Sequence, residues 1–385
     1  MEHLLIIPSW YSSRHRPIVG IFFKEQAEIL SKKIDKVGVV SPLFRSFKDF
    51  DVSGNQNQFM NVNGVITYTQ EIWHYPLLEK LNNKRWFTTC KHLFEKYIND
   101  NGLPDIIHVH SITIARDIIK YINKKYNIPF VITEHSTGFA MNGYNKKDLK
   151  IFKSNIDYCA YNIAVSESLA QTLSQKLGST WNVIPNTIQN VFFEEGNKRL
   201  SFPRDKQKKI FFTLSNLIPV KGLDILIKAF SMLYKENTNV ELWIGGDGSE
   251  KKNIEHQIKE LKMEDRVFLL GKLDRENVLE NLKKADFYIS PSLQETFGVV
   301  IIEALAMGLP TVATRCGGPE HIINDEVGII VEKGSADELY SAMKLILANE
   351  NNYDNKKIID YCRDNYSEDV VSEKIINVYR EVLNG

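Results

Sequence analysis

The chain has 385 residues, of which 43% are hydrophobic and 25% are charged, and this composition is typical of a soluble globular protein with two domains. Its 48 Lys and Arg residues balance 48 Asp and Glu residues, so net charge argues neither for nor against a nucleic-acid partner, and we expect none. The N-terminal apolar run, Leu4 to Ile7, is too short for a signal peptide or a membrane-spanning helix, and no other run is long enough.

Four cysteines are scattered along the chain without C-x-x-C spacing: Cys90, Cys159, Cys316 and Cys362. This pattern favours a reduced, cytosolic chain without structural zinc. The D-x-D pattern at Asp49-Phe50-Asp51 lies in a polar, turn-rich stretch and does not follow a clear strand, so we attribute it to chance. We expect neither a metal ion nor a cofactor.

The first predicted strand, Leu4 to Ile7, leads through a loop into a helix that begins near Gly20. A loop that joins a strand to a helix at a glycine suits the approach of a phosphate, because the first N–H groups of a helix are free. The loop is not a G-x-G-x-x-G motif, so the motif itself is weak. Gly20 is the candidate residue, and the alternative is that it only eases the helix start.

The predicted helix from Glu79 to Tyr97 mixes aromatic and leucine side chains with Lys and Arg. A basic helix with aromatics can lie on an anionic membrane surface. More often such a helix covers its own domain while its cations stay in water, and we favour this interpretation.

Two later predicted strands end in histidine motifs. The strand 105–110 ends in His110, and the strand 129–133 is followed by His135. Ligands of open α/β sheets bind at the carboxyl ends of the strands, so both histidines are candidate site residues. Taken alone, a histidine in such a place is more often structural. The loop 139–147, which contains Tyr144, is a candidate lid.

The composition changes after Phe193, where a charged stretch from Glu194 to Lys209 contains Gly196 and Pro203 and is typical of a linker. We place a first domain at residues 1–195, a linker at 196–208 and a second domain at 209–366. In the second domain, predicted strands precede loops that contain Asn216 and Lys221, Gly246, and Lys272.

The stretch 285–314 predicts a strand, a loop, a buried helix and a further strand. Glu295 stands in the loop, Phe297-Gly298 begins the helix, and Glu303 lies within its apolar run. A buried carboxylate is costly unless it is hydrogen-bonded, so Glu303 binds either a ligand hydroxyl or a buried Arg. Glu295 is either a ligand contact or a surface acid.

Glu295 and Glu303, with seven residues between them and Phe297-Gly298 after the first, resemble the E-x7-E signature of retaining glycosyltransferases of family 4. Similar landmarks at 164–166, 183–186 and 315–320 extend the resemblance over almost the whole chain. The resemblance implies an α/β protein of GT-B architecture, with two Rossmann-like domains whose parallel sheets face a central cleft. It also implies that a last helix, at about 367–385, crosses back to the first domain.

The implied activity is a metal-independent hexosyl transfer with retention of configuration, from a nucleotide-diphosphate sugar to a hydroxyl of a glycan or lipid-linked acceptor. The implied setting is bacterial cell-surface polysaccharide or glycolipid synthesis in the cytoplasm, at the inner face of the membrane with a peripheral membrane contact. The acceptor attacks from the face that the diphosphate leaves, and the departing phosphate oxygen takes the acceptor's proton.

The resemblance also implies roles for single residues. Glu295 holds sugar hydroxyls, Lys221 binds the diphosphate, and His135 lies beside the transferred sugar. The other donor-side candidates are Gly20, Asn216, Gly246, Lys272, Phe297, Gly298 and the ribose ligand Glu303, and the acceptor-side candidates are His110 and Tyr144.

One position departs from the family, because Asn216 stands where an Arg usually pairs with the diphosphate. This departure keeps open a catalytically silent partner that only binds the nucleotide sugar. A non-hydrolysing sugar-nucleotide epimerase shares the two-domain shape, but the E-x7-E spacing argues against it.

Overall fold

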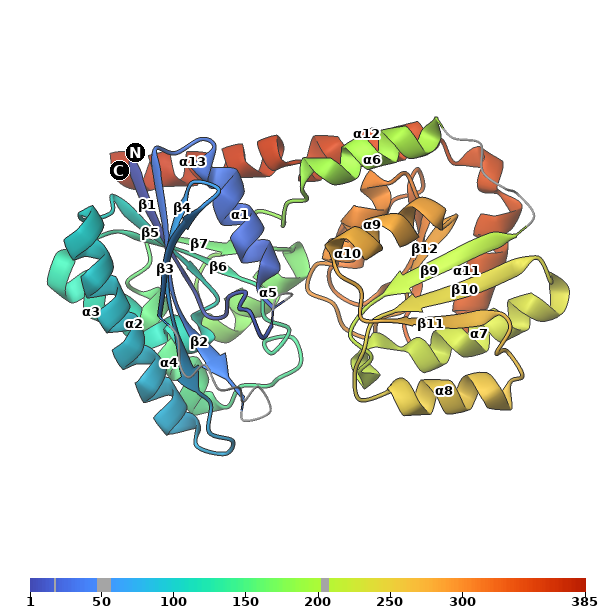
Figure 1. The fold of residues 1–385 in the computed structure, drawn as a ribbon, viewed down its shortest axis with the longest axis horizontal. Helices are drawn as coiled ribbons and strands as arrows, with labels where there is room; N and C mark the ends of the chain where they lie inside the picture. Colours follow the sequence, from blue (N-terminus) through green and yellow to red (C-terminus); the bar gives the residue numbers. More distant parts are fainter. Residues whose placement is uncertain (17–18, 47–56, 202–207) are drawn as a thin grey trace. The chain divides into compact units, whose positions relative to one another are not determined.

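The computed structural model describes residues 1–16, 19–46, 57–201 and 208–385. The chain divides into two compact units, each built on its own sheet (Figure 1). The first unit comprises Met1–Val165, Ala170–Ile184 and Ser372–Gly385, and the second comprises Ser166–Leu169 and Pro185–Val371. The Asp49-x-Asp51 pattern and the central part of the expected linker lie outside the described residues.

The sheet of the first unit has eight strands in the order β3-β4-β2-β1-β5-β6-β7-β8. Neighbouring strands are parallel, except that β3 runs antiparallel to β4 at the edge. The strands are β1 (His3–Pro8), β2 (Lys36–Arg45), β3 (Asn57–Val62), β4 (Val65–Trp73), β5 (Ile106–His110), β6 (Phe130–Glu134), β7 (Tyr161–Ala164) and β8 (Asn182–Val183).

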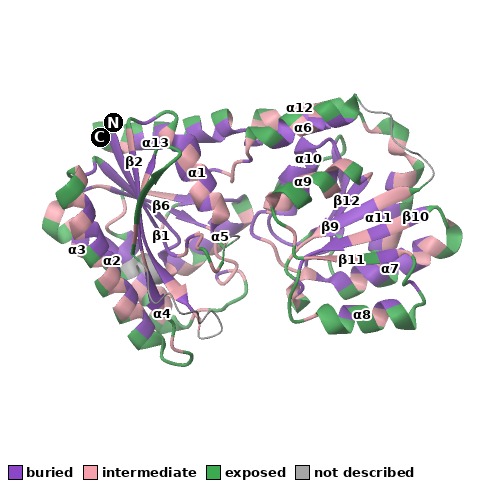
Figure 2. Ribbon diagram, viewed as in Figure 1, coloured by how far each residue is buried: buried purple, intermediate pink, exposed green. Residues whose placement is uncertain are grey.

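The helices that cross between these strands are α1 (Ile21–Ser31), α2 (Glu79–Asn101), α3 (Ile112–Tyr126), α4 (Lys146–Ile156) and α5 (Glu167–Leu177). Every residue of β1, β5 and β6 is buried, as expected for parallel strands covered on both faces (Figure 2). Helix α2 packs Trp86, Leu93 and Tyr97 toward the sheet at helical spacing, so most of this helix covers its own unit.

The second unit contains a six-stranded, fully parallel sheet in the order β11-β10-β9-β12-β13-β14. Its strands are β9 (Lys209–Leu214), β10 (Val240–Gly245), β11 (Val267–Gly271), β12 (Phe287–Ser290), β13 (Thr311–Arg315) and β14 (Gly328–Glu332). Its helices are α6 (Asn190–Leu200), α7 (Leu223–Glu236), α8 (Lys251–Glu260), α9 (Arg275–Lys284), α10 (Val299–Ala306), α11 (Ala336–Ala348) and α12 (Asn355–Tyr366), with 3₁₀ turns at Pro219–Lys221, Pro319–His321 and Glu350–Asn352. None of the helices in the described part of the chain has the length and apolar character that crossing a bilayer requires.

Helix α6 covers residues that the sequence assigns to the end of the first domain and to the linker, and it belongs to the second unit. The buried Arg199 side chain of α6 donates hydrogen bonds to the carbonyl oxygens of Lys283 at 3.2 Å, Ala285 at 2.8 Å and Met307 at 3.2 Å. These carbonyls lie at the ends of α9 and α10, so a charged side chain ties α6 to the second unit.

The last helix, α13 (Glu368–Asn384), passes into the first unit at Ser372. Within that unit, the hydroxyl of Tyr379 lies 2.6 Å from Nδ1 of His108, and Nε2 of His108 lies 2.7 Å from the Thr133 hydroxyl. The His108 ring is fully buried, and burial lowers its pKa from 6.5 to about 3. A neutral imidazole therefore links β5, β6 and the last helix.

This contact predicts that the contribution of His108 to stability depends on pH. Above about pH 6.5 the imidazole is neutral in both states, whereas between about pH 6.5 and 3 only the unfolded chain binds the proton. The gap in unfolding free energy between the native protein and His108→Asn should therefore shrink by about 1.4 kcal/mol per pH unit as pH falls through this window. Urea unfolding at pH 7.5, 6.0 and 5.0 measures the gap, and a gap that stays constant contradicts the neutral buried imidazole.

Candidate active site

Three loops of the second unit are joined where neighbouring strands β9, β12 and β13 end. The N–H of Leu293 donates to the carbonyl oxygen of Val220 at 2.8 Å, which joins the loops after β12 and β9. Glu295 exchanges backbone hydrogen bonds with the loop after β13, to the Cys316 carbonyl at 3.2 Å and from the Gly318 N–H at 2.8 Å. The backbone of Glu295 is therefore fixed on both sides.

Lys221 and Glu295 form an ion pair across two of these loops, with Nζ and Oε2 2.5 Å apart. Both side chains are 19% exposed, so the pair is open to a ligand but shielded from bulk water. Gly222 makes the approach of the loops possible, because its φ is +61° and a Cβ there would lie 2.4 Å from the Pro291 carbonyl oxygen. The structure thus brings together the two residues that the sequence assigns to diphosphate and sugar.

Glu320 stabilises the turn that is hydrogen-bonded to Glu295, and sequence reasoning missed this residue. Its carboxylate accepts hydrogen bonds from the backbone N–H of Cys316 at 3.1 Å and of Gly317 at 2.9 Å. The backbone of the same turn also bonds to Glu295: the Cys316 carbonyl accepts from the Glu295 N–H, and the Gly318 N–H donates to the Glu295 carbonyl. Its position after two glycines is a usable signal, because an acid there can hold exposed N–H groups of a tight turn.

Phe297 and Gly298 stand directly before α10, as predicted. Gly298 is the residue before the first helical turn, with φ +106°, and Phe297 is buried against the ring of Tyr366. The first N–H groups of α10 are therefore presented next to the Lys221–Glu295 pair, where the helix dipole favours an anion.

Glu303 is 2% exposed and forms an ion pair with Arg275, the first residue of α9. The Arg275 guanidinium also lies 4.7 Å from the centre of the Phe192 ring. This is the arginine partner that the sequence left as an alternative, although Arg275 is 30% exposed rather than buried. The contact of Glu303 with a ribose stays a prediction.

Three further donor-side candidates lie on adjacent loops. Gly246 follows β10 with φ +132°, and a Cβ there would lie 1.8 Å from the Ser215 carbonyl oxygen, so only glycine allows the loops after β9 and β10 to meet. The side chains of Asn216 and Lys272 are exposed. Neither of these two side chains is part of the Lys221–Glu295 ion pair.

In the first unit, His110 and His135 lie in contact at the ends of β5 and β6, with Nδ1 of His110 3.1 Å from Nε2 of His135. The Phe23 ring of α1 packs against both, with centroids 4.7 and 5.0 Å away. Burial lowers the pKa of His135 to about 3 and holds the pKa of His110 well below its usual value. Both rings are therefore neutral hydrogen-bonding groups at neutral pH.

Glu134 holds the histidine loop in place, and sequence reasoning did not select it. Its fully buried carboxylate accepts from the Ser111 hydroxyl at 2.7 Å and from the N–H groups of Ile112, His135 and Ser136 at 3.0, 2.9 and 2.8 Å. The signal was an acid at the end of an otherwise apolar strand, since such a residue must find several donors.

Tyr144 is joined to the same loop, because its hydroxyl lies 2.8 Å from the Ser136 hydroxyl. Its ring packs between Phe139 and Phe152, which fixes the candidate lid on α4. Gly20 is buried at the start of α1, with φ +69°, on the helix that carries Phe23. The first unit thus gathers His110, His135 and Tyr144 around one loop.

Across the described ranges, no three His, Cys, Asp or Glu side chains are grouped so that they could hold a metal ion. The charged groups that the structure gathers in the second unit are instead a lysine and two carboxylates with their partners.

Two family models match the chain, "Glycosyltransferase Family 4" over residues 19–189 and "Glycosyl transferases group 1" over residues 195–364. The chain is 30% identical over 293 residues to N-acetyl-α-D-glucosaminyl L-malate synthase of Bacillus anthracis, a match that covers 72% of this chain and 74% of that protein. Among solved structures, sucrose-phosphate synthase from Thermosynechococcus elongatus is similar with a TM-score of 0.79 and 18% identity over 100% of both chains.

Anabaena Alr3699/HepE, solved in complex with UDP, is similar with a TM-score of 0.75 and 18% identity over 99% of this chain and 100% of that one. These similarities confirm the predicted GT-B fold of two Rossmann-like domains with parallel sheets. Together with the two family models and the 30% identical relative, they show that the chain belongs to glycosyltransferase family 4.

Proposed function

We propose that the chain transfers a hexose-type sugar, with retention of configuration, from a UDP-sugar to a hydroxyl of a glycan or lipid-linked acceptor. The observation that carries this proposal is the Lys221–Glu295 ion pair at the start of α10. It puts an ammonium group, a carboxylate and free helix N–H groups at one place, and a sugar diphosphate needs all three. The UDP complex of the similar Anabaena protein supports the choice of nucleotide.

In this proposal Lys221 exchanges a carboxylate partner for the diphosphate when the donor binds. The exchange frees Glu295 to accept hydrogen bonds from sugar hydroxyls. As the bond between the anomeric carbon and the diphosphate oxygen breaks, Lys221 and the N–H groups of Phe297 and Gly298 stabilise the negative charge that develops. Within residues 215–222 Lys221 is the only cation, because Asn216 stands in place of the usual arginine.

The acceptor oxygen attacks the anomeric carbon from the side that the diphosphate leaves, and its proton passes to the departing phosphate oxygen. His135 is proposed to hydrogen-bond the transferred sugar as a neutral imidazole, since burial keeps its pKa far below neutral pH. Gly20, Gly246, Lys272 and Glu303 are proposed to complete the donor contacts, and His110 and Tyr144 to lie on the acceptor side. No metal ion enters these steps.

The residues just before α2 and at its start support a contact with an anionic membrane at which a lipid-linked acceptor would be met. Leu77 is fully exposed, and its φ of +68° is strained for a leucine, while Leu78 and Leu81 are 52% and 41% exposed. Lys80 and Lys84 are exposed beside them. Leucines flanked by lysines fit a surface of acyl chains and negative headgroups. We infer that the protein works at the cytoplasmic face of a membrane.

The roles of Lys221 and Glu295 predict two different kinetic losses. Glu295→Gln should lower kcat about 100-fold with little change in KM for the UDP-sugar, because it removes a sugar contact that matters most in the transition state. Lys221→Met should lower kcat by about 100-fold and also raise KM, because the diphosphate loses its cation. Release of UDP from a panel of UDP-sugars, with added acceptors, measures both.

The exposed Lys228 and Glu264, changed to Met and Gln, are matched controls that should leave both constants unchanged. A native protein that binds UDP but releases none from any UDP-sugar supports the silent binding partner instead. If Lys221→Met has the same kcat and KM as the native protein, Lys221 does not bind the diphosphate.

The membrane contact predicts a loss of vesicle binding. Leu77→Ser combined with Leu78→Ser should abolish co-sedimentation with vesicles containing 30% phosphatidylglycerol, and Lys80→Glu with Lys84→Glu should do the same at low salt. Leu103, which is 55% exposed elsewhere on the first unit, provides the control Leu103→Ser. Equal binding by all of these variants, or no binding by the native protein, contradicts the membrane contact.

A further inference from the structure

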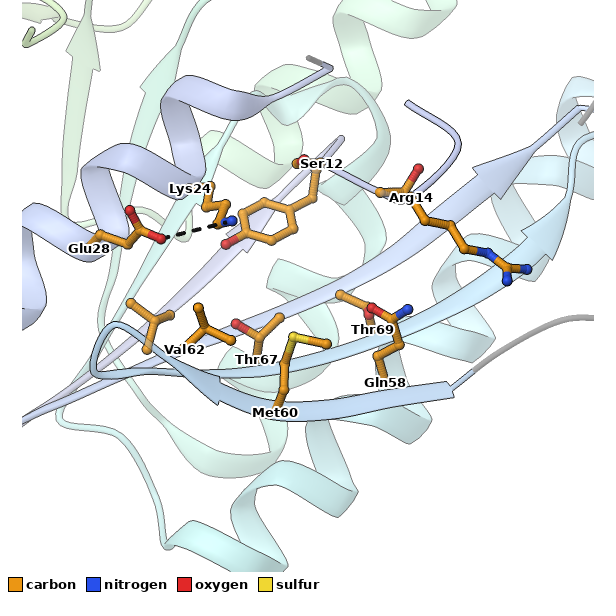
Figure 3. Close-up of a pocket in the computed structure, with 12 residues that line it drawn as sticks. Ser12, Arg14, Lys24, Glu28, Gln58, Met60, Val62, Thr67 and Thr69 are labelled. Atoms are coloured by element: carbon orange, nitrogen blue, oxygen red, sulfur yellow. Dashed lines mark ion pairs between the residues drawn. The ribbon is translucent and has the colours of Figure 1, made fainter. Parts of the chain in front are cut away.

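A pocket of about 250 Å³ opens in the first unit between α1, the β3–β4 hairpin and the loop that follows β1 (Figure 3). Its floor consists of three cross-strand pairs of the hairpin: Gln58 with Thr69, Met60 with Thr67, and Val62 with Val65. These residues alternate along their strands, so all six lie on one face of the sheet. The pocket thus lies where α1 leaves the edge of the sheet uncovered.

The wall opposite this floor comes from α1 and from the loop after β1. Lys24 and Glu28 stand one helical turn apart on α1, with Nζ and Oε1 4.0 Å apart, and Figure 3 shows them across the pocket from Met60 and Thr67. The largely buried Tyr11 closes the loop side. The charges of Lys24 and Glu28 cancel, and Arg14, which also lines the pocket, is paired with Glu71 at 3.3 Å. Since each charged side chain of the lining has a partner of opposite charge, the pocket suits a neutral ligand.

The polar groups of the floor have spare hydrogen-bonding capacity. In the described structure, neither the Gln58 amide nor the Thr69 hydroxyl takes part in a side-chain hydrogen bond or ion pair. An amide, a hydroxyl and a weak lysine–glutamate pair offer both donors and acceptors, while Met60 and Val65 offer an apolar surface. A sugar ring has the matching character, with hydroxyl groups around its edge and C–H groups on its faces.

The size of the pocket agrees with one such ring. Pockets that enclose drug-sized ligands begin at about 300 Å³, and this pocket is slightly smaller. A single saccharide unit therefore fits better than a nucleotide or a folded peptide.

The strand register relates the pocket to the histidine pair. Thr67 pairs with Val39, Val39 with Ile6, and Ile6 with His108, so these residues form one row across four strands. At about 4.8 Å per strand, the pocket floor lies about 14 Å from β5, which carries His110 two residues further on. Since residues two apart share a face, His110 lies on the same face as the pocket, and helix α1 contacts both.

We propose that this pocket binds one neutral sugar unit of the acceptor, at a distance from the hydroxyl that reacts. This inference rests on the proposed function, and it narrows the acceptor to a saccharide of more than one unit. The unit in the pocket would be held by Gln58, Thr69 and the Lys24–Glu28 pair, while the reacting unit lies beside the histidine pair.

Binding of simple saccharides to the full-length protein tests this proposal without a need for turnover. The probes are the methyl glycosides of glucose, galactose, mannose and N-acetylglucosamine, measured by saturation-transfer difference NMR. At least one probe should receive saturation from the native protein, and Gln58→Leu and Thr69→Val should each weaken its binding at least tenfold. Asn61→Leu is the matched control, because Asn61 lies on the same strand with its side chain on the opposite face.

Two results would overturn the proposal: no saturation of any probe by the native protein, or equal binding by the native protein and both pocket variants. Thermal melting shows whether each variant is folded. UDP binding, which the proposed function assigns to the second unit, should be unchanged in both variants. If UDP binds and the probes do not, the acceptor pocket fails and the proposed function stands. If the probes bind and UDP does not, the pocket stands as a saccharide site and the donor assignment fails.

Discussion

Parallel strands end together at one edge of a sheet, and this constraint places the Lys221–Glu295 pair and the histidine pair of the candidate site. In the second unit, the loops after β9, β12 and β13 are joined by backbone hydrogen bonds, so Lys221 and Glu295 meet although 74 residues separate them. In the first unit, the ends of β5 and β6 bring His110 to His135 in the same way. The connecting helices supply what strand ends lack, which is free N–H groups and a dipole.

A second constraint is that each buried or half-buried carboxylate must have donors. Glu134 takes four donors from the ends of two strands, Glu320 takes the N–H groups of a glycine turn, and Glu303 takes Arg275. Removing such donors would leave a buried charge unpaired at a cost of several kcal/mol. These three carboxylates therefore have their partners without a ligand, whereas both members of the Lys221–Glu295 pair are accessible.

The strands before the candidate site loops and the loop positions of Glu295 and Lys221 followed from the sequence, because apolar runs and strand-end motifs are local patterns. The two parallel sheets followed from the family resemblance, and the strands β3 and β14 were not predicted. The pairing of Arg275 with Glu303 could not be predicted, because the two residues lie 28 positions apart on different helices and no local pattern marks the pair. The residues of helix α6 were assigned to the end of the first domain and to the linker, since its charged outer face dominates the composition while Arg199 turns inward. The pocket on the hairpin could not be predicted from the sequence either, because the pairing of β3 with β4 determines which residues form its floor.

In the proposed function, Lys221 gives up Glu295 for the diphosphate of the donor. Calorimetric titration of UDP into the native protein, Lys221→Met, Glu295→Gln and the double variant tests this exchange. Lys221→Met should weaken UDP binding at least tenfold, about 1.4 kcal/mol. Glu295→Gln should bind UDP at least as tightly as the native protein, because the competing carboxylate is gone, and the double variant should behave like Lys221→Met. Native affinity in Lys221→Met, or a tenfold loss in Glu295→Gln, would contradict the exchange.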